Sequence, residues 1–322
     1  MMRIGMKEEL AMALDPQAKA FLEMNEAAGA PPTSSMTPEE NRLRTAEIGK
    51  LAGIPKAVAR VENRLIPVED AQIGIRIYTP QGTGPFPVFV YFHGGGWVIG
   101  DLDTVDTVCR NIAHESDCLV VSVDYRLAPE HKFPIPVNDC YAAVEWVARH
   151  AATLQGDPEK IAIGGDSAGG NLAAVVAQLA KERQGPALSF QALIYPAVQL
   201  GSETESYREN GEGYFLTADS MNWFFQQYLN GEEEKQNVLA SPLLREDLTG
   251  LPPTLVITAE YDPLRDEGAM YAQRLREAGV PVEYTCYEGM IHGFFWMGGI
   301  MDKGAQAVSQ VANSLRSVFM RL

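Results

Sequence analysis

The sequence predicts an α/β fold built on a mostly parallel sheet of eight strands that is flanked by helices. From residue 87 onward, short apolar runs alternate with longer segments of helical periodicity, as in repeated strand–helix units. Ahead of this series, two segments alternate apolar and polar side chains in the manner of a half-exposed antiparallel pair. Continuous apolar runs suit strands that are buried on both faces of a parallel sheet.

Two short helices open the predicted order, at 16–29 and 38–52, because each has a proline just inside its start. The antiparallel pair follows at 62–68 and 73–80. The six further strands are expected at 87–93, 118–125, 160–165, 190–196, 254–260 and 282–288. The helices that connect them are expected at 104–116, 136–151, 168–184 and 265–279. A closing amphipathic helix places Val308, Val311, Leu315 and Phe319 on one face.

One stretch, residues 199–249, interrupts the strand–helix series with polar and aromatic residues. It holds at least one helix, at about 217–229, and no clear strand. We therefore predict an insertion rather than a part of the core.

Charge and composition restrict the partners of the chain. With 26 basic and 42 acidic residues the net charge is −16, which disfavours nucleic acid and anionic membranes because both repel an acidic surface. No apolar run approaches the roughly 18 residues that span a bilayer, and the N-terminal segment lacks a secretory pattern. We expect a cytoplasmic protein without membrane insertion. The cysteines show no metal or disulfide spacing and are expected to be reduced and mostly buried: Cys109, Cys118, Cys140 and Cys286.

The segment Gly165-Asp166-Ser167-Ala168-Gly169 joins a predicted strand directly to a predicted helix and matches G-x-S-x-G. This pattern is typical of a nucleophile elbow, whose glycines permit a tight turn that exposes the serine hydroxyl above the sheet. The N-terminus of the following helix would direct free N–H groups to the same point. The alternative is a glycine-rich turn or phosphate-binding loop, although no Lys-Ser/Thr follows as a P-loop requires.

A serine hydroxyl needs a base to accept its proton and a third group to orient that base. His292 follows the last predicted strand, where the chain order serine, acid, histidine puts the base; the alternative is a structural histidine. The acid should follow the strand at 254–260, and Asp262 is preferred because Pro263 fixes its turn. The alternatives nearby are Glu260, Asp266 and Glu267. The last two fall in the first turn of a helix, where acids commonly only complement the helix dipole.

The segment "FHGGGWVIGD" (92–101) follows a predicted strand at the position that supplies oxyanion donors in hydrolases of this chain order. Its three glycines let backbone N–H groups approach a developing negative oxygen. A flexible loop without such a role is the alternative.

The motifs "HGGGW", "YRLAPEHKFP", "GDSAGGN", "DPLRDEG" and "HGF", in this order, resemble those of the bacterial hormone-sensitive-lipase-like (family IV) carboxylesterases of the α/β-hydrolase superfamily. The resemblance covers nearly the whole chain. It implies an α/β-hydrolase fold with a helical cap formed by 1–52 and the insertion 199–249, over a core formed by 53–198 and 250–322. It also implies that the last strand can pair between subunits in a homodimer.

For the site, the resemblance implies that Ser167 is the nucleophile, His292 the base and Asp262 the acid that orients it. The implied donors of the oxyanion hole are Gly95, Gly96 and Ala168, while His93 braces the glycine loop. The expected reaction is hydrolysis of short- to medium-chain acyl esters through an acyl-enzyme, without a metal or an organic cofactor.

An apolar substrate pocket is expected beneath the cap. Its predicted substrate-binding residues are Trp97, Asp166, Tyr195 and Phe294, with Trp296 nearby. Aromatic residues of the insertion either cover this pocket or only pack cap against core: Tyr214, Phe215, Trp223, Phe224 and Phe225.

Three other functions remain open. A ligand receptor on the same fold is disfavoured because all three triad candidates are present. An amidase, peptidase or deacetylase could use the same triad, since fold does not fix the substrate. A scaffolding protein would have no need for the elbow and the glycine loop together.

Overall fold

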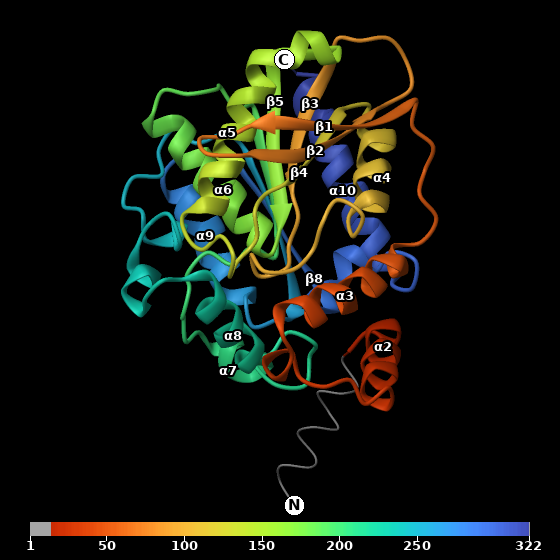
Figure 1. The fold of residues 1–322 in the computed structure, drawn as a ribbon, viewed down its shortest axis with the longest axis vertical. Coiled ribbons are helices and arrows are strands. Elements are labelled where there is room, and N and C mark those ends of the chain that lie inside the picture. Colours follow the sequence, from red (N-terminus) through yellow and green to blue (C-terminus); the bar gives the residue numbers. More distant parts are fainter. Residues whose placement is uncertain (1–13, 322) are drawn as a thin grey trace, which may run out of the picture.

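Eight strands form one sheet in the computed structural model, which describes residues 14–321. Their order is β1-β2-β4-β3-β5-β6-β7-β8, and β2 pairs antiparallel with both β1 and β4 while the other neighbours are parallel (Figure 1). The strands are β1 (Arg60–Pro67), β2 (Gln72–Thr79), β3 (Phe86–Phe92), β4 (Leu119–Asp124), β5 (Gly156–Asp166), β6 (Phe190–Ile194), β7 (Thr254–Tyr261) and β8 (Val282–Ile291). The predicted mostly parallel sheet of eight strands, with an antiparallel edge pair, is confirmed.

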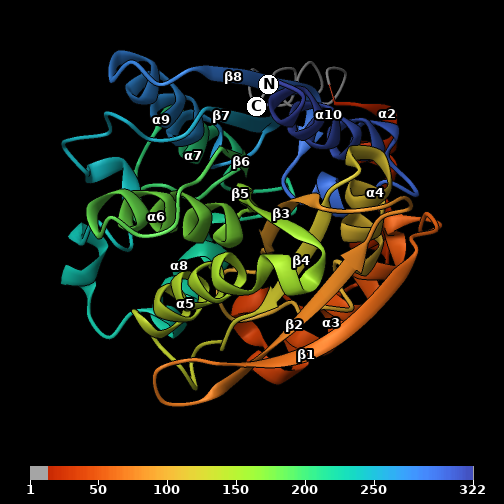
Figure 2. The same ribbon diagram turned by 90° about the horizontal axis from the view of Figure 1, so that it is seen from above.

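Helices cover both faces of this sheet (Figure 2). One face carries α4 (Asp106–Ser116) and α10 (Asp302–Phe319), and the other carries α5 (Ile135–His150), α6 (Ala168–Glu182) and α9 (Arg265–Glu277). Successive side chains of β3 enter the two cores in alternation, since a strand directs them to opposite faces. The predicted apolar face of α10 is buried, as expected: Val308, Val311, Leu315 and Phe319.

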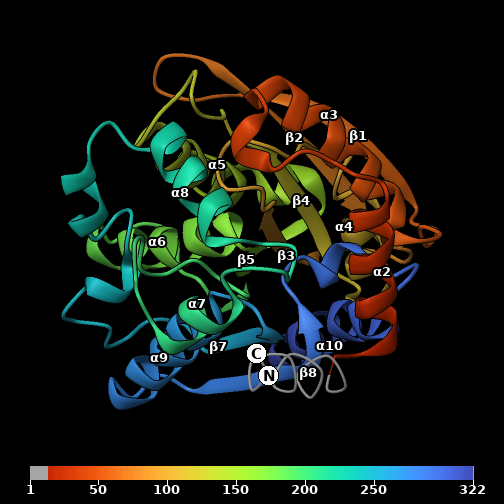
Figure 3. The same ribbon diagram turned by 90° about the horizontal axis from the view of Figure 1, so that it is seen from below.

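The remaining helices lie at the end of the sheet where the parallel strands finish (Figures 1 and 3). They are α2 (Pro16–Ala27) and α3 (Pro38–Gly49) before the sheet, and α7 (Glu205–Asn210) and α8 (Ala218–Tyr228) in the insertion. The Ser34 hydroxyl donates to the carboxylate of Asp219, which joins the two segments. We call residues 14–52 and 199–249 the cap segments; residues 1–13 of the predicted cap lie outside the described residues.

The structure differs from the prediction mainly at element ends. β8 continues to Ile291 rather than 288, because Tyr261 pairs with Ile291 beyond an irregularity in the β7–β8 ladder. β5 begins at Gly156, where Phe86 pairs with it ahead of another irregularity, although "GDPEK" carries no apolar pattern. Within residues 14–321, the structure shows no helix with the length and apolarity needed to cross a membrane.

Candidate active site

Ser167 occupies the sharp turn between β5 and α6. Its backbone has φ 55° and ψ −118°, a conformation that costs a non-glycine residue on the order of 1–3 kcal/mol. Neighbouring strands hold it there, because Ser167 N donates to Ile194 O at 2.8 Å. A Cβ on Gly169 would collide with the carbonyl oxygens of Phe92 and His93, so the helix can approach β3 this closely only with glycine at that position.

His292 lies between Ser167 and Asp262. Its Nε2 is 2.9 Å from Ser167 Oγ, and its Nδ1 is 2.7 Å from Asp262 Oδ2. An ionised carboxylate can only accept, so Nδ1–H donates to Asp262 and leaves Nε2 of the neutral ring to accept from the Ser167 hydroxyl. Asp262 and His292 are both buried, whereas Ser167 is half-buried. The structure thus brings the three predicted residues into one hydrogen-bonded chain.

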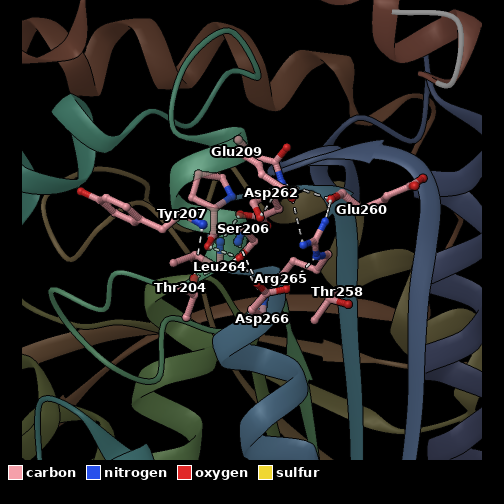
Figure 4. Close-up of polar contacts among 12 residues, drawn as sticks. Thr204, Ser206, Tyr207, Glu209, Thr258, Glu260, Asp262, Leu264, Arg265 and Asp266 are labelled. Atoms are coloured by element: carbon pink, nitrogen blue, oxygen red, sulfur yellow. Dashed lines mark hydrogen bonds and ion pairs between the residues drawn. The ribbon is translucent and has the colours of Figure 1, made fainter. Parts of the chain in front are cut away.

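Asp262 is held in a turn that α7 supports from outside the sheet (Figure 4). Leu264 N donates to Asp262 Oδ1 at 2.9 Å, so each carboxylate oxygen has a partner. The Ser206 hydroxyl donates to Pro263 O at 2.9 Å, and Asn210 Nδ2 donates to Asp262 O at 3.4 Å. Asp262 therefore has little freedom to rotate away from His292.

The alternative acids have other partners. Glu260 accepts from Gly289 N at 2.6 Å, and Asp266 accepts from Ser206 N at 2.7 Å. Glu267 lies in the first turn of α9, as predicted, but it is buried there. It accepts from Val198 N at 2.7 Å and from Gln199 N at 3.1 Å, a role beyond the expected one of complementing the helix dipole. Burial, with the charge of Asp262 nearby, raises the pKa of Glu267 to about 8.

The glycine loop folds back beside the elbow. Gly95, Gly96 and Trp97 have φ values of 112°, 57° and 62°, and the N–H groups of Val98 and Ile99 both donate to Gly95 O at 3.0 Å. Three consecutive residues with positive φ turn the chain sharply, as a loop that presents N–H groups to one point requires.

Asp166, predicted to bind substrate, contacts this loop. Its Oδ1 accepts from Gly94 N at 3.0 Å and from the Tyr91 hydroxyl. Burial raises the pKa of Asp166, while both hydrogen bonds favour its ionised form. Sequence reasoning missed this connection, because the only signal was an acid adjacent to the serine.

The three predicted aromatic pocket residues pack within the protein. Trp97 stacks on Tyr228 of α8 with centroids 4.3 Å apart and planes 3° apart. The ring of Tyr195 lies 4.4 Å from that of His292 and 5.8 Å from that of Phe294. All three, like Asp166, are at most 1% exposed, so their contact with substrate stays a prediction.

His93 begins the glycine loop. Its Nδ1 is 2.7 Å from Gly94 O, and its ring stacks on Tyr125 with centroids 4.4 Å apart. The Tyr125 hydroxyl donates to His93 O at 2.7 Å. Through these contacts His93 supports the start of the glycine loop. It takes no part in the hydrogen bonds that join Ser167, His292 and Asp262.

The sheet order, the serine at a strand–helix turn and the histidine after the last strand define the class of α/β-hydrolases. The sequence model of a family described as alpha/beta hydrolase fold matches residues 89–296. The chain belongs to this family, in its hormone-sensitive-lipase-like branch of carboxylesterases, as the motifs predicted.

Similar proteins agree with this assignment. The carboxylesterase NlhH of Mycobacterium tuberculosis is 42% identical over 80% of this chain and 82% of its own length. An arylesterase of Saccharolobus solfataricus is 36% identical over 96% of this chain and 100% of its own. Among solved structures, a hyperthermophilic esterase from the archaeon Pyrobaculum calidifontis superposes with a TM-score of 0.91 at 45% identity, covering 94% of this chain and 98% of that one.

Proposed function

We propose that this carboxylesterase hydrolyses short- to medium-chain acyl esters with Ser167 as nucleophile, His292 as base and Asp262 as the acid that orients it. The observation that carries the proposal is the hydrogen-bonded chain from Ser167 Oγ through His292, 2.9 Å and 2.7 Å long at its two links. A nucleophile bonded to a base that a third group holds in one tautomer is the arrangement required for acyl transfer.

The reaction has two halves. Ser167 Oγ attacks the ester carbonyl carbon as its proton moves to His292 Nε2, and the carbonyl oxygen becomes an oxyanion. Collapse of this intermediate breaks the bond to the alcohol, which takes the proton from His292 and leaves an acyl-enzyme. Water then attacks the acyl carbon by the same proton route, releasing the acid and restoring Ser167.

The N–H groups of Gly95, Gly96 and Ala168 are the proposed oxyanion donors. Ala168 is the first residue of α6, so its N–H is free of the helix and adds to the positive end of the dipole. One such donor contributes roughly 3–4 kcal/mol of transition-state stabilisation. Since a fixed geometry is needed, the positive-φ turn from Gly95 to Trp97 supports this role.

The substrate class follows from what covers the site. We propose that the cap segments form a cap over the core predicted at 53–198 and 250–322. Phe224 and Phe225 of α8 are buried, and Trp97 packs on Phe225 with centroids 6.4 Å apart. A bounded aromatic enclosure favours short and medium acyl chains over long ones.

Hydrolysis of p-nitrophenyl esters from acetate to palmitate tests the proposal, with Ser167→Ala as the matched variant. We expect the hydrolysis rate to fall steeply for acyl chains longer than medium length. We expect Ser167→Ala to have no activity on any of these esters. Activity that survives Ser167→Ala would refute the nucleophile. A folded but inert intact protein would favour the receptor, and turnover of acyl anilides at rates matching the esters would favour an amidase.

A homodimer through β8 is a further proposal. β8 is the last strand in the sheet order, so within residues 14–321 one of its edges has no strand beside it. An unpaired edge can accept a strand from a second copy. A monomer in light scattering at micromolar concentration would refute it.

A further inference from the structure

Arg42, on α3 of the cap segments, reaches the glycine loop of the core. Its Nε donates to Val98 O at 2.8 Å, and its Nη2 donates to Ala128 O at 3.0 Å. The same guanidinium pairs with both carboxylate oxygens of Glu130, at 2.8 and 2.7 Å. One planar group therefore fixes a cap helix to two loops of the core.

The second of these loops, residues 125–134, carries the motif "YRLAPEHKFP", to which the proposed chemistry gives no role. We call it the bracket loop. Ala128 N donates to Trp97 O at 2.9 Å, which joins the bracket loop to the glycine loop. At its other end, Phe133 N donates to Tyr228 O at 2.8 Å and Lys132 Nζ to Leu229 O at 2.7 Å, at the end of α8.

The glycine loop is thus held between two cap helices that approach the same end of the sheet (Figures 1 and 3). Arg42 of α3 binds it through Val98, and Phe224 of α8 lies against Gly96 so closely that a Cβ there would collide with the ring. A turn with three successive positive φ values needs such outside support to stay in one shape.

We propose that Arg42 is a positioning residue for the oxyanion hole: it holds the turn from Gly95 to Val98 so that the N–H groups of Gly95 and Gly96 aim at the reacting carbonyl. This inference rests on the proposed function. Small displacements of preorganised donors weaken transition-state binding while ground-state binding changes little. Arg42 therefore acts on kcat more than on KM.

Arg44 offers a matched control on the same helix. Its guanidinium donates to Pro31 O at 2.9 Å, to Thr33 Oγ1 at 2.7 Å and to Asn41 Oδ1 at 2.8 Å, all within the N-terminal cap segment. Arg44→Gln removes the same charge from the same helix and weakens the N-terminal cap segment, but Arg44 makes none of these hydrogen bonds to the glycine loop. It separates a loss of cap stability from a loss of oxyanion geometry.

The experiment compares Arg42→Gln, Arg42→Lys and Arg44→Gln with the intact enzyme on p-nitrophenyl butyrate. The readouts are kcat, KM, Tm and the inhibition constant of an alkyl trifluoromethyl ketone, which forms a tetrahedral oxyanion adduct with a serine nucleophile. For Arg42→Gln we expect kcat to fall about tenfold with KM within about twofold, and the inhibitor to weaken by the same factor as kcat.

Arg44→Gln should leave kcat and inhibition within about twofold even where Tm falls. Arg42→Lys keeps the charge but lacks the planar guanidinium that spans both carbonyls, so its kcat should fall about threefold. This variant also keeps the test possible if Arg42→Gln fails to fold. Arg42 variants with unchanged kcat and inhibition, or with losses equal to those of Arg44→Gln, would overturn the inference. Activity in Ser167→Ala would instead overturn the proposed function, so the two failures are distinguishable.

Discussion

The nucleophile elbow and the glycine loop lie side by side, and both adopt positive φ values, yet they are held in different ways. Ser167 is fixed by the backbone of β6 and by the close approach of α6 to β3. The glycine loop is fixed by the side chains of Asp166, Arg42 and Phe224, two of which belong to the cap segments. The core alone therefore positions the nucleophile, whereas the cap segments also help to position the glycine loop, which carries the proposed oxyanion donors.

This difference predicts a gradient of effects. Changes to the hydrogen-bonded residues Ser167, His292 and Asp262 should remove catalysis almost entirely, because no other group can take over the attack or the proton transfer. Changes around the glycine loop should be graded, because several contacts share the support.

The largest effect after loss of the nucleophile is expected for Asp262→Asn. An amide nitrogen would donate to His292 Nδ1 and favour the tautomer with a proton on Nε2, which cannot accept from Ser167. We expect kcat to fall about 10⁴-fold with the fold intact. Single-turnover kinetics and Tm measure this, with Glu260→Gln as the control near the same turn. Equal losses in both variants would contradict the assignment of the acid.

Gly96→Ala is expected to lower kcat about 10²-fold, since it disturbs one oxyanion donor. The added Cβ collides with the Phe224 ring, and the alanine must also adopt a φ of 57°, which strains a residue with a side chain. Combining it with Phe224→Ala should recover part of the loss by removing the collision. A double variant no better than Gly96→Ala would show that contact with α8 does not hold the loop.

Asp166→Ala is expected to lower kcat about tenfold, because Gly94 N and the Tyr91 hydroxyl lose their common acceptor. Asp166→Asn keeps an acceptor oxygen and should lose less. KM should stay within about twofold in both, as for a residue that acts on the loop. A rise in KM at constant kcat would support the sequence-based prediction that Asp166 binds substrate and contradict a role through the loop.

The smallest effect on activity is expected for Glu267→Gln, which instead changes how stability depends on pH. The pKa of Glu267 is raised to about 8, so the folded state binds this proton more tightly than the unfolded state. The stabilisation is complete below the ordinary pKa near 4.5 and is lost as pH rises through about 8. Tm of the wild type should therefore fall more between pH 5 and 8 than Tm of Glu267→Gln. Parallel Tm curves would contradict a protonated Glu267.

The contrast between the two regions also explains what sequence could predict. The strands, the elbow and the order of Ser167, Asp262 and His292 follow from local patterns, and the structure places these residues in contact. No such pattern predicted the contacts of Arg42 and Asp166 with the glycine loop, because their partners there are 56 and 72 positions away along the sequence. The burial of Glu267 was missed for the same reason, since its partners lie in the segment after β6. Periodicity reports which face of an element is buried, and long-range polar partners follow only from the packed fold.

Covalent labelling tests the central claim most directly. The intact protein is treated with a p-nitrophenyl alkylphosphonate, and the adduct is mapped by peptide mass spectrometry while residual esterase activity is followed. We predict one phosphonyl group per chain on the peptide containing Ser167, with activity lost in proportion to labelling and no adduct in Ser167→Ala. Labelling at another residue, or full activity at complete labelling of Ser167, would contradict the account.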